Sequence, residues 1–252
     1  MLEKKVNFYS VIIGTELLNG RRKDAHFAFL NQQLLSRGWE HKASFVIADD
    51  TNLMKNIFNL IKSDPNSVMF CFGGIGATPD DYTREVAANV FTDEKMEFHE
   101  ESKSRIINQF GSEAYPHRIN MAYLPKNAKL LTNVVNNVAG FYLEDRFFFT
   151  PGFPSMSQAM VVEALDLLYP KSQEKYRCVM TIDCSENDLI DIMKKMPKHL
   201  DFASLPRFIG DTRKVVVSLA GYDKDEVNKC FQLFIDFCEN NGIEFVFSDM
   251  CF

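Results

Sequence analysis

Cysteine and histidine motifs for metal binding are absent from this sequence. Its six cysteines include no C-x-x-C pair, and none is spaced with histidine as zinc ligands would be. The five histidines are scattered and include no H-x-x-x-H pair. A zinc-bound or disulfide-linked scaffold is therefore not expected, and the cysteines are best interpreted as small core residues in a reducing cytoplasm.

Long hydrophobic runs and an excess of basic charge are also lacking. No stretch approaches the roughly 20 apolar residues that cross a bilayer. The apolar run at residues 6–13 is short, and no small-residue cleavage site follows it, so it predicts a buried strand and not a signal peptide. The net charge of −6 argues against a general nucleic-acid binder. We therefore expect a cytoplasmic protein whose partners include neither nucleic acid nor a membrane.

Two common catalytic motifs are missing as well. The glycine-rich segment at residues 73–76 is not followed by Lys-Ser or Lys-Thr, so it is not the P-loop of an ATPase. Ser10, Ser155 and Ser157 lack the G-x-S-x-G context of a nucleophile elbow. A phosphate ligand would therefore have to be held by backbone amides, helix ends or a metal.

The 252-residue chain does contain a regular alternation of apolar runs and amphipathic segments. This alternation predicts an α/β fold, a doubly wound and mostly parallel sheet with helices on its faces. The expected strands are 6–13, 39–48 and 67–72, and the expected helices are 24–37, 50–62 and 79–91.

The rest of the chain is expected to complete this domain and to add a second one. A helix at 97–110, a hairpin of 140–143 with 146–150, and a helix at 155–168 precede a polar junction at 170–174. After it, strands at 176–182, 202–209, 214–219 and 243–247 and helices at 186–196 and 223–241 predict a small ferredoxin-like βαββαβ unit. We expect one domain at 1–170 and a second at 171–252.

The most informative segment is the loop Gly73-Gly74-Ile75-Gly76-Ala77-Thr78-Pro79-Asp80-Asp81. In an open parallel sheet, ligands bind beyond the carboxyl ends of the strands, where this loop leaves its strand. Its three glycines let backbone N–H groups approach a ligand closely. Thr78 as N-cap, Pro79 at the first helical position and Asp81 as the capping-box carboxylate predict a helix start, which would favour an anion.

The paired carboxylates Asp80 and Asp81 allow two interpretations. They can simply stabilise the helix dipole, each by roughly 0.3–1 kcal/mol, but one acidic residue would serve that purpose. Two carboxylates would repel a bare phosphate, whereas a divalent cation such as Mg²⁺ could bridge them to it. The functional interpretation makes both residues metal ligands.

Two further loops are expected at the same edge of the sheet. The triplet Gly14-Thr15-Glu16 follows the first strand and could be a ligand loop or only a turn. The segment Pro151-Gly152-Phe153-Pro154-Ser155 is a stiff turn, and Ser155 with Gln158 forms a possible capping box. Turn chemistry alone explains this segment about as well as ligand contact does.

Together the three loops resemble those of the MoaB/Mog molybdopterin-binding family, and in particular its CinA-like branch. The glycine loop and the following Tyr82-Thr83-Arg84-Glu85 are similar to the branch signature G-G-x-G-P-T-x-D-D-x-T-R-E. The segments Gly14–Gly20 and 151–156 resemble its first loop and its P-G-x-P loop. The resemblance covers about residues 6–168, and the βαββαβ unit resembles the next domain of CinA proteins.

This resemblance implies a site for the phosphate of molybdopterin or of a nucleotide. In the CinA-like branch it implies metal-dependent hydrolysis of ADP-ribose to AMP and ribose 5-phosphate, with Mg, Mn or Co as the metal. In the Mog branch it implies adenylation of molybdopterin. Full CinA proteins end in a nicotinamide-nucleotide deamidase domain, for which we expect no room here. The expected partners are a phosphorylated small molecule and further copies of the chain.

The sequence departs from the family pattern at several positions. His26 stands where the family has Asn in a D-T-N segment, and Ala77 replaces a proline. In the family's N-P-x-G-x-A-P-G-F segment, Asn133 is retained, but Asn136 replaces a loop glycine. Asn tolerates positive φ better than most residues, so we expect the turn to persist.

Two hypotheses follow for the site as a whole. In the first, amides of Gly74, Gly76 and Ala77 hold a phosphate, Asp80 and Asp81 hold the metal, and Glu16 acts as a base or outer metal contact. In the second, the pocket binds a pterin or nucleotide without catalysis, which the changes at His26 and Asn136 favour. The remaining expected ligand-binding residues are Gly14, Thr15, His26, Gly73, Thr78, Asn133, Pro151, Gly152 and Ser155.

Overall fold

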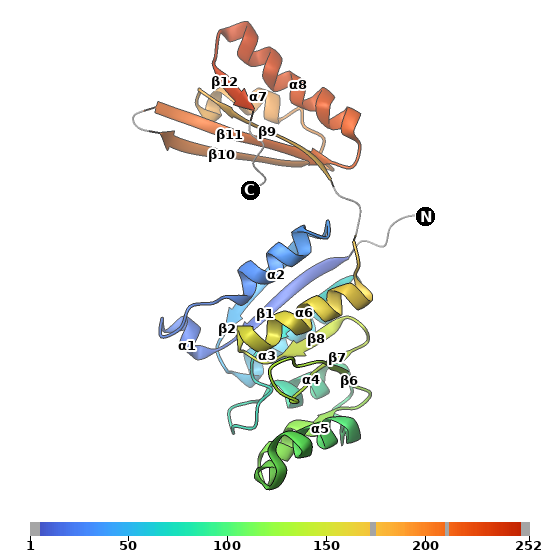
Figure 1. The fold of residues 1–252 in the computed structure, drawn as a ribbon. Helices are drawn as coiled ribbons and strands as arrows, with labels where there is room; N and C mark the ends of the chain where they lie inside the picture. Colours follow the sequence, from blue (N-terminus) through green and yellow to red (C-terminus); the bar gives the residue numbers. More distant parts are fainter. Residues whose placement is uncertain (1–5, 172–174, 210–211, 248–252) are drawn as a thin grey trace. The chain divides into compact units, whose positions relative to one another are not determined.

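A computed structural model describes residues 6–171, 175–209 and 212–247. The chain divides into two compact units, residues 1–172 and 173–252 (Figure 1). Within the described residues, no helix combines the length and the apolar character needed to span a membrane. The five cysteines in this part of the chain are free thiols.

The first unit is built on a six-stranded sheet with the order β2-β1-β3-β8-β7-β6. Four neighbouring strands run parallel. They are β2 (His41–Ile47), β1 (Asn7–Ile13), β3 (Ser67–Phe72) and β8 (Phe147–Thr150). β7 (Gly140–Leu143) is antiparallel to both β8 and the edge strand β6 (Lys129–Leu131). The predicted mostly parallel sheet and its β7–β8 hairpin are confirmed.

Helices cover both faces of this sheet, as a doubly wound fold requires (Figure 1). One face packs against α2 (His26–Leu35) and α6 (Pro154–Leu168). The other packs against α3 (Thr51–Lys62) and α4 (Thr83–Phe91). Because both faces are covered, every residue of β3 is buried. Each large side chain buried in this way contributes about 1.5–3 kcal/mol to folding.

A smaller group of elements extends the first unit between α4 and β6. It contains β4 (Met96–Phe98), α5 (Glu100–Phe110), two 3₁₀ helices (Gly111–Ala114 and Arg118–Ala122) and β5 (Tyr123–Pro125). β4 and β5 form a separate antiparallel pair. The sequence predicted only the helix of this group, because three-residue strands are too short to show an alternating pattern.

The second unit is a four-stranded antiparallel sheet with the order β10-β11-β9-β12. Its elements follow the predicted βαββαβ order. They are β9 (Tyr176–Ile182), a 3₁₀ turn (Glu186–Leu189), α7 (Ile190–Met193), β10 (Asp201–Ile209), β11 (Thr212–Gly221), α8 (Lys224–Asn241) and β12 (Phe245–Phe247). The helix predicted at 186–196 is shorter and divided. Val217, Phe231 and Phe234 belong to the core between sheet and helices.

Candidate functional site

Three loops meet at the carboxyl edge of the parallel strands of the first unit. We call residues 14–20, which contain the one-turn helix α1 (Thr15–Leu18), the first loop. Residues 73–81 are the glycine loop and residues 151–155 the third loop. The Gly73 N–H donates to the carbonyl of Thr150 at 2.9 Å, and the Gly14 N–H donates to that of Ile47 at 3.0 Å. A Cβ on Gly152 would lie 3.3 Å from the Gly73 Cα, so the third loop and the glycine loop are in backbone contact.

The start of the glycine loop requires glycine for both conformation and space. Gly73 and Gly74 have φ of 105° and 69°, which L side chains rarely adopt. A Cβ on Gly73 would lie 2.6 Å from the carbonyl oxygen of Ile13, and one on Gly74 would strike the Thr83 hydroxyl. The loop is therefore pressed against the end of β1 and the start of α4.

The predicted helix start at Thr78 and Pro79 is wrong, because α4 begins at Thr83. Asp81 Oδ2 accepts hydrogen bonds from the Thr78 N–H, at 2.9 Å, and from its hydroxyl, which closes a turn before the helix. The Thr83 N–H then donates to the Gly74 carbonyl at 3.0 Å. Asp81 thus accepts the bond from the Thr78 N–H that was predicted of a capping-box carboxylate, but the bond closes a turn and not a helix, and the loop is longer than the sequence predicts.

Arg84 determines which way the loop's peptide groups point. This side chain is 5% exposed, and its Nη1 donates to the carbonyls of Ile75 and Gly76. Burial lowers the pKa of Arg84, while the charges of Glu85 and Asp81 oppose that effect. Arginine nevertheless stays protonated in proteins. Its guanidinium thus fixes two consecutive carbonyls of the loop on one side.

The amides that follow these carbonyls face the other way. A trans peptide points its N–H opposite to its C=O, and the loop contains no cis bond. The N–H groups of Gly76 and Ala77 therefore point away from Arg84. In the part of the chain that the structure describes, neither these two N–H groups nor that of Gly74 has a protein acceptor. The glycine loop therefore presents N–H groups that are free to donate to a ligand.

The two carboxylates of the loop differ in what they can still bind. Asp81 is engaged by Thr78, and its carboxylate lies over Gly76, where a Cβ would come within 2.7 Å of Oδ2. Asp80 is exposed, and hydrogen bonding from Thr78 and from its own backbone lowers its pKa. Asp80 is thus a charged and accessible carboxylate, whereas Asp81 shapes the loop through Oδ2, and its Oδ1 accepts no hydrogen bond within the part of the chain that the structure describes.

The residues described fit a metal only with help from the ligand. Within residues 6–171, 175–209 and 212–247, no group of three or more His, Cys, Asp or Glu side chains could hold an ion together. Mg²⁺ commonly keeps several waters and binds through one or two carboxylates plus substrate phosphates. Asp80 and Asp81 suit that second arrangement and not a complete protein cage.

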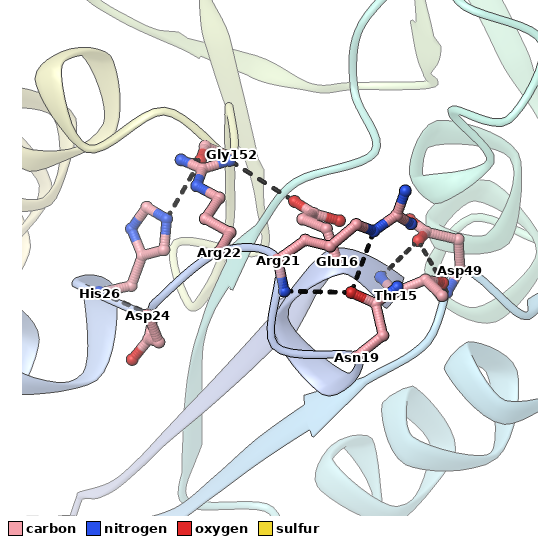
Figure 2. A network of polar contacts seen from close by, with 9 residues as sticks. All are labelled: Thr15, Glu16, Asn19, Arg21, Arg22, Asp24, His26, Asp49 and Gly152. Atoms are coloured by element: carbon pink, nitrogen blue, oxygen red, sulfur yellow. Dashed lines mark hydrogen bonds and ion pairs between the residues drawn. The ribbon is translucent and has the colours of Figure 1, made fainter.

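The first loop is fastened by its own polar contacts (Figure 2). The N–H and the hydroxyl of Thr15 each donate to Asp49 Oδ2 at 2.8 Å. The Glu16 carboxylate lies 2.9–3.0 Å from where a Gly14 Cβ would be, and its Oε1 is 3.5 Å from Arg22 Nη1. Gly14 therefore makes room for Glu16, and Thr15 ties the first loop to Asp49, two residues after β2.

Arg22 joins the first loop to the third loop (Figure 2). Its Nη2 donates to the Gly152 carbonyl at 2.7 Å, and its guanidinium lies 5.5 Å from the centre of the Phe153 ring. A cavity of about 10 Å³, room for one water molecule, lies between Glu16, Arg22 and Gly152. Arg22 is a site residue that sequence analysis missed, although the run Arg21-Arg22-Lys23 directly after the first loop could have signalled it.

His26, expected to contact a ligand, is only 4% exposed. Its ring stacks on Phe72 with centroids 4.5 Å apart. Nε2 lies 3.3 Å from the Gly152 carbonyl oxygen, and Nδ1 lies 3.3 Å from the Ser157 hydroxyl. Burial lowers the pKa of His26, so the neutral ring is favoured near neutral pH. We interpret His26 as a residue that positions the third loop.

Asn133 and Asn136 stabilise a separate loop. Asn133 Nδ2 donates to Asn136 Oδ1 and to the Val138 carbonyl, both at 2.9 Å. The Val138 N–H donates to Asn136 Oδ1 at 2.9 Å. The turn persists, but Asn136 does not adopt the positive φ that we expected.

The third loop leads directly into a helix. α6 begins at Pro154 with Phe153 as its N-cap, and no side chain caps it. The predicted capping box of Ser155 and Gln158 is therefore wrong, because Ser155 already lies in the first helical turn. Pro151 and Gly152 precede that turn, and Gly152 forms the contact with the glycine loop.

Several known proteins are similar to this chain in sequence or in fold. A Pyrococcus abyssi protein is 27% identical over 253 residues, which cover 93% of this chain and 96% of its own length. A CinA-like protein of Prochlorococcus marinus is 30% identical over 172 residues, 65% of this chain but only 40% of its own length. A crystal structure of CinA from Thermoplasma acidophilum covers 64% of this chain and 97% of that one, with a TM-score of 0.57 and 24% identity, and shows the same fold.

A family model described as "Probable molybdopterin binding domain" matches residues 10–170. That range contains the first loop, the glycine loop and the third loop, and it amounts to well over half of the chain. This chain therefore belongs to the molybdopterin-binding domain family.

Proposed function

We propose that this chain binds a phosphorylated pterin or nucleotide by its phosphate at the glycine loop. The observation that carries the proposal is the pair of outward-facing N–H groups of Gly76 and Ala77, held in place by Arg84. Backbone amides aimed at a common point form a ready anion site. The family to which the chain belongs binds molybdopterin, which carries such a phosphate.

Positive charge beside the loop supports the same proposal. Arg21, Arg22 and Lys23 lie together next to the first loop, in a chain whose net charge is −6. Charges concentrated at a rim attract an oppositely charged ligand even when the whole protein repels it. Arg22 also contacts Gly152, so this positive charge is fixed at the point where the loops meet.

A more specific proposal is that the chain catalyses the hydrolysis of ADP-ribose or a related dinucleotide. Water would add to one phosphorus of the pyrophosphate, and the bridging oxygen would leave with the other phosphate, giving AMP and ribose 5-phosphate. Asp80 and Asp81 would hold a divalent cation, which supplies charge neutralisation and activates water. Glu16, on the neighbouring loop, would accept the proton from the attacking water. Adenylyl transfer to a pterin would use the same anchor with a different acceptor.

A non-catalytic binding protein is the second candidate. The observation that favours it is that Thr78 engages Asp81, which leaves Asp80 as the only carboxylate of the glycine loop with no part in closing its turn. In this case the glycine loop would still bind a phosphate, and Asp80 would lie beside it without a catalytic role.

One experiment separates the two candidates. The full chain is titrated calorimetrically with AMP and ADP-ribose, and AMP release from ADP-ribose is followed with Mg²⁺, Mn²⁺ or Co²⁺. Binding together with metal-dependent AMP release supports the hydrolase, and binding without turnover supports the binding protein. Absence of binding to any phosphorylated ligand, with or without metal, would refute both.

A further inference from the structure

Phe153 is an exposed aromatic residue in the third loop of the candidate site. Its side chain is 59% exposed, although it lies at the carboxyl edge of the sheet, between Gly152 and the start of α6. A single exposed apolar residue is ordinary on a protein surface. What distinguishes Phe153 is that its surroundings hold it in place.

One face of the ring is already occupied. The Arg22 guanidinium lies 5.5 Å from the ring centre, and its Nη2 is fixed by the Gly152 carbonyl at 2.7 Å. Arginine stacks readily on aromatic faces, because its planar cation is attracted by the negative face of the ring. The high exposure of Phe153 means that other parts of the ring remain open to solvent.

The ring also lies close to the phosphate anchor. Gly152, the residue before Phe153, is in backbone contact with Gly73, and the free amides of Gly76 and Ala77 follow three and four residues later. Three residues of extended chain span at most about 10 Å. A ligand held by its phosphate at the glycine loop can therefore reach Phe153 with a ring that it carries.

We propose that Phe153, supported by Arg22, is the stacking platform for the heteroaromatic ring of the phosphorylated ligand. The inference rests on the proposed phosphate site and adds a specificity-determining residue to it. Stacking a base on an aromatic side chain is worth about 5- to 150-fold in affinity. It selects for a planar ring without dictating which one, as suits both a pterin and an adenine.

The test compares two ligands that share a phosphate and differ in the ring. AMP and ribose 5-phosphate are titrated into the full-length wild type, Phe153→Ala and Phe153→Leu. Wild type should bind AMP at least 5-fold more tightly. Phe153→Ala should lose about 5- to 150-fold toward AMP and less than 2-fold toward ribose 5-phosphate. Phe153→Leu keeps apolar bulk without a flat face, so its affinity for AMP should lie between those of wild type and Phe153→Ala.

A matched control is available on the same unit. Phe98 is 45% exposed on β4 and also has a cation near its ring, with Lys103 Nζ 5.9 Å from the centroid. Phe98→Ala should leave both affinities unchanged. The Phe153 variants should stay folded, because no side chain caps α6 at this position. Circular dichroism checks this.

The outcomes separate the platform from the phosphate site. If wild type binds both ligands equally, or if Phe153→Ala weakens both equally, the platform is refuted while the phosphate site stands. If wild type binds neither ligand, the proposed function fails and the platform fails with it. A pterin phosphate titrated beside AMP identifies the preferred ring. The proposal is supported if Phe153→Ala loses affinity for either of these ligands but not for ribose 5-phosphate, and if Phe98→Ala loses none.

Discussion

Replacing Arg84 by Met should weaken ligand binding at the glycine loop while the protein stays folded. The change keeps most of the side-chain stem and removes the guanidinium that holds the carbonyls of Ile75 and Gly76. Without it, the N–H groups of Gly76 and Ala77 lose their fixed direction. We expect affinity for AMP to fall at least tenfold, which corresponds to about 1.4 kcal/mol.

The expected loss of stability is modest, because two effects oppose each other. A hydrogen bond to a charged group is worth about 1.5–3 kcal/mol, and Arg84 makes two. Removing a buried charge, however, also removes its desolvation cost. A net destabilisation of about 2–4 kcal/mol is therefore expected, or roughly 5–15 °C in the melting temperature of a unit of this size.

Arg146 provides a matched control at the other end of the sheet. It also donates to backbone carbonyls, those of Pro65 and Asp64, at 3.2 and 3.3 Å. Its buried Nε has no hydrogen-bond partner, as is also true of Arg84. Arg146→Met should lower the melting temperature comparably and leave AMP affinity unchanged. If Arg84→Met also retains full affinity, the orientation of the amides does not depend on Arg84 and the argument is refuted.

Further predictions concern the carboxylates, the loop amide, the buried histidine and the domain boundary. Asp80→Asn should abolish most metal-dependent AMP release, and Asp81→Asn should in addition disturb the loop, because Asp81 accepts two hydrogen bonds from Thr78. Ala77→Pro restores the proline of the family signature and removes one N–H donor, so phosphate binding should persist through the Gly74 and Gly76 amides with at most a severalfold loss by calorimetry. His26 has a folded pKa below its ordinary value of 6.5, so the unfolded chain binds more protons below that pH. Stability should therefore be full above pH 6.5 and fall on acidification by up to about 1.4 kcal/mol per pH unit, a dependence lost in His26→Gln. The phosphate of AMP itself titrates at about pH 6, so AMP affinity should follow the same pH profile from pH 6 to 8 in wild type and in His26→Gln. A fragment ending near residue 168 should fold and bind AMP.

Each of these has an outcome that contradicts it. Equal rates and affinities in wild type, Asp80→Asn and Asp81→Asn would reduce the carboxylates to loop-shaping residues. Complete loss of binding in Ala77→Pro would show that the Gly74 and Gly76 amides do not suffice to hold the phosphate. Affinity that weakens from pH 6 to 8 in wild type but not in His26→Gln would make His26 a charged ligand contact. A soluble but unfolded fragment would show that the two units depend on each other.

The sequence by itself determined the order and type of the longer elements. β3 and β9 lie where the sequence predicts them, residue for residue, because each is a short apolar run bounded by polar or turn residues. The βαββαβ order of the second unit also follows from local periodicity alone. The glycine loop was recognisable because closely spaced glycines signal a backbone that must bend or approach a neighbour.

Local signals failed where a contact elsewhere in the loop competed with them. The helix start predicted at Thr78 gave way to the turn closed by Asp81 and to the hydrogen bond from Thr83 back to Gly74. The short strands β4, β5 and β6 escaped notice because three residues carry no measurable period. In both cases the sequence pattern was too local to show which partner the backbone would find.

Only the tertiary structure decided how the site is assembled. Arg22 and Gly152 are 130 residues apart in the chain, yet the parallel sheet brings their loops to one edge and a hydrogen bond joins them. Arg84 reads in the sequence as an ordinary helical residue, and its role follows from burial beneath the glycine loop. Patterns in a sequence report on neighbours a few residues away, whereas packing between distant segments determines which donors, charges and rings face a ligand.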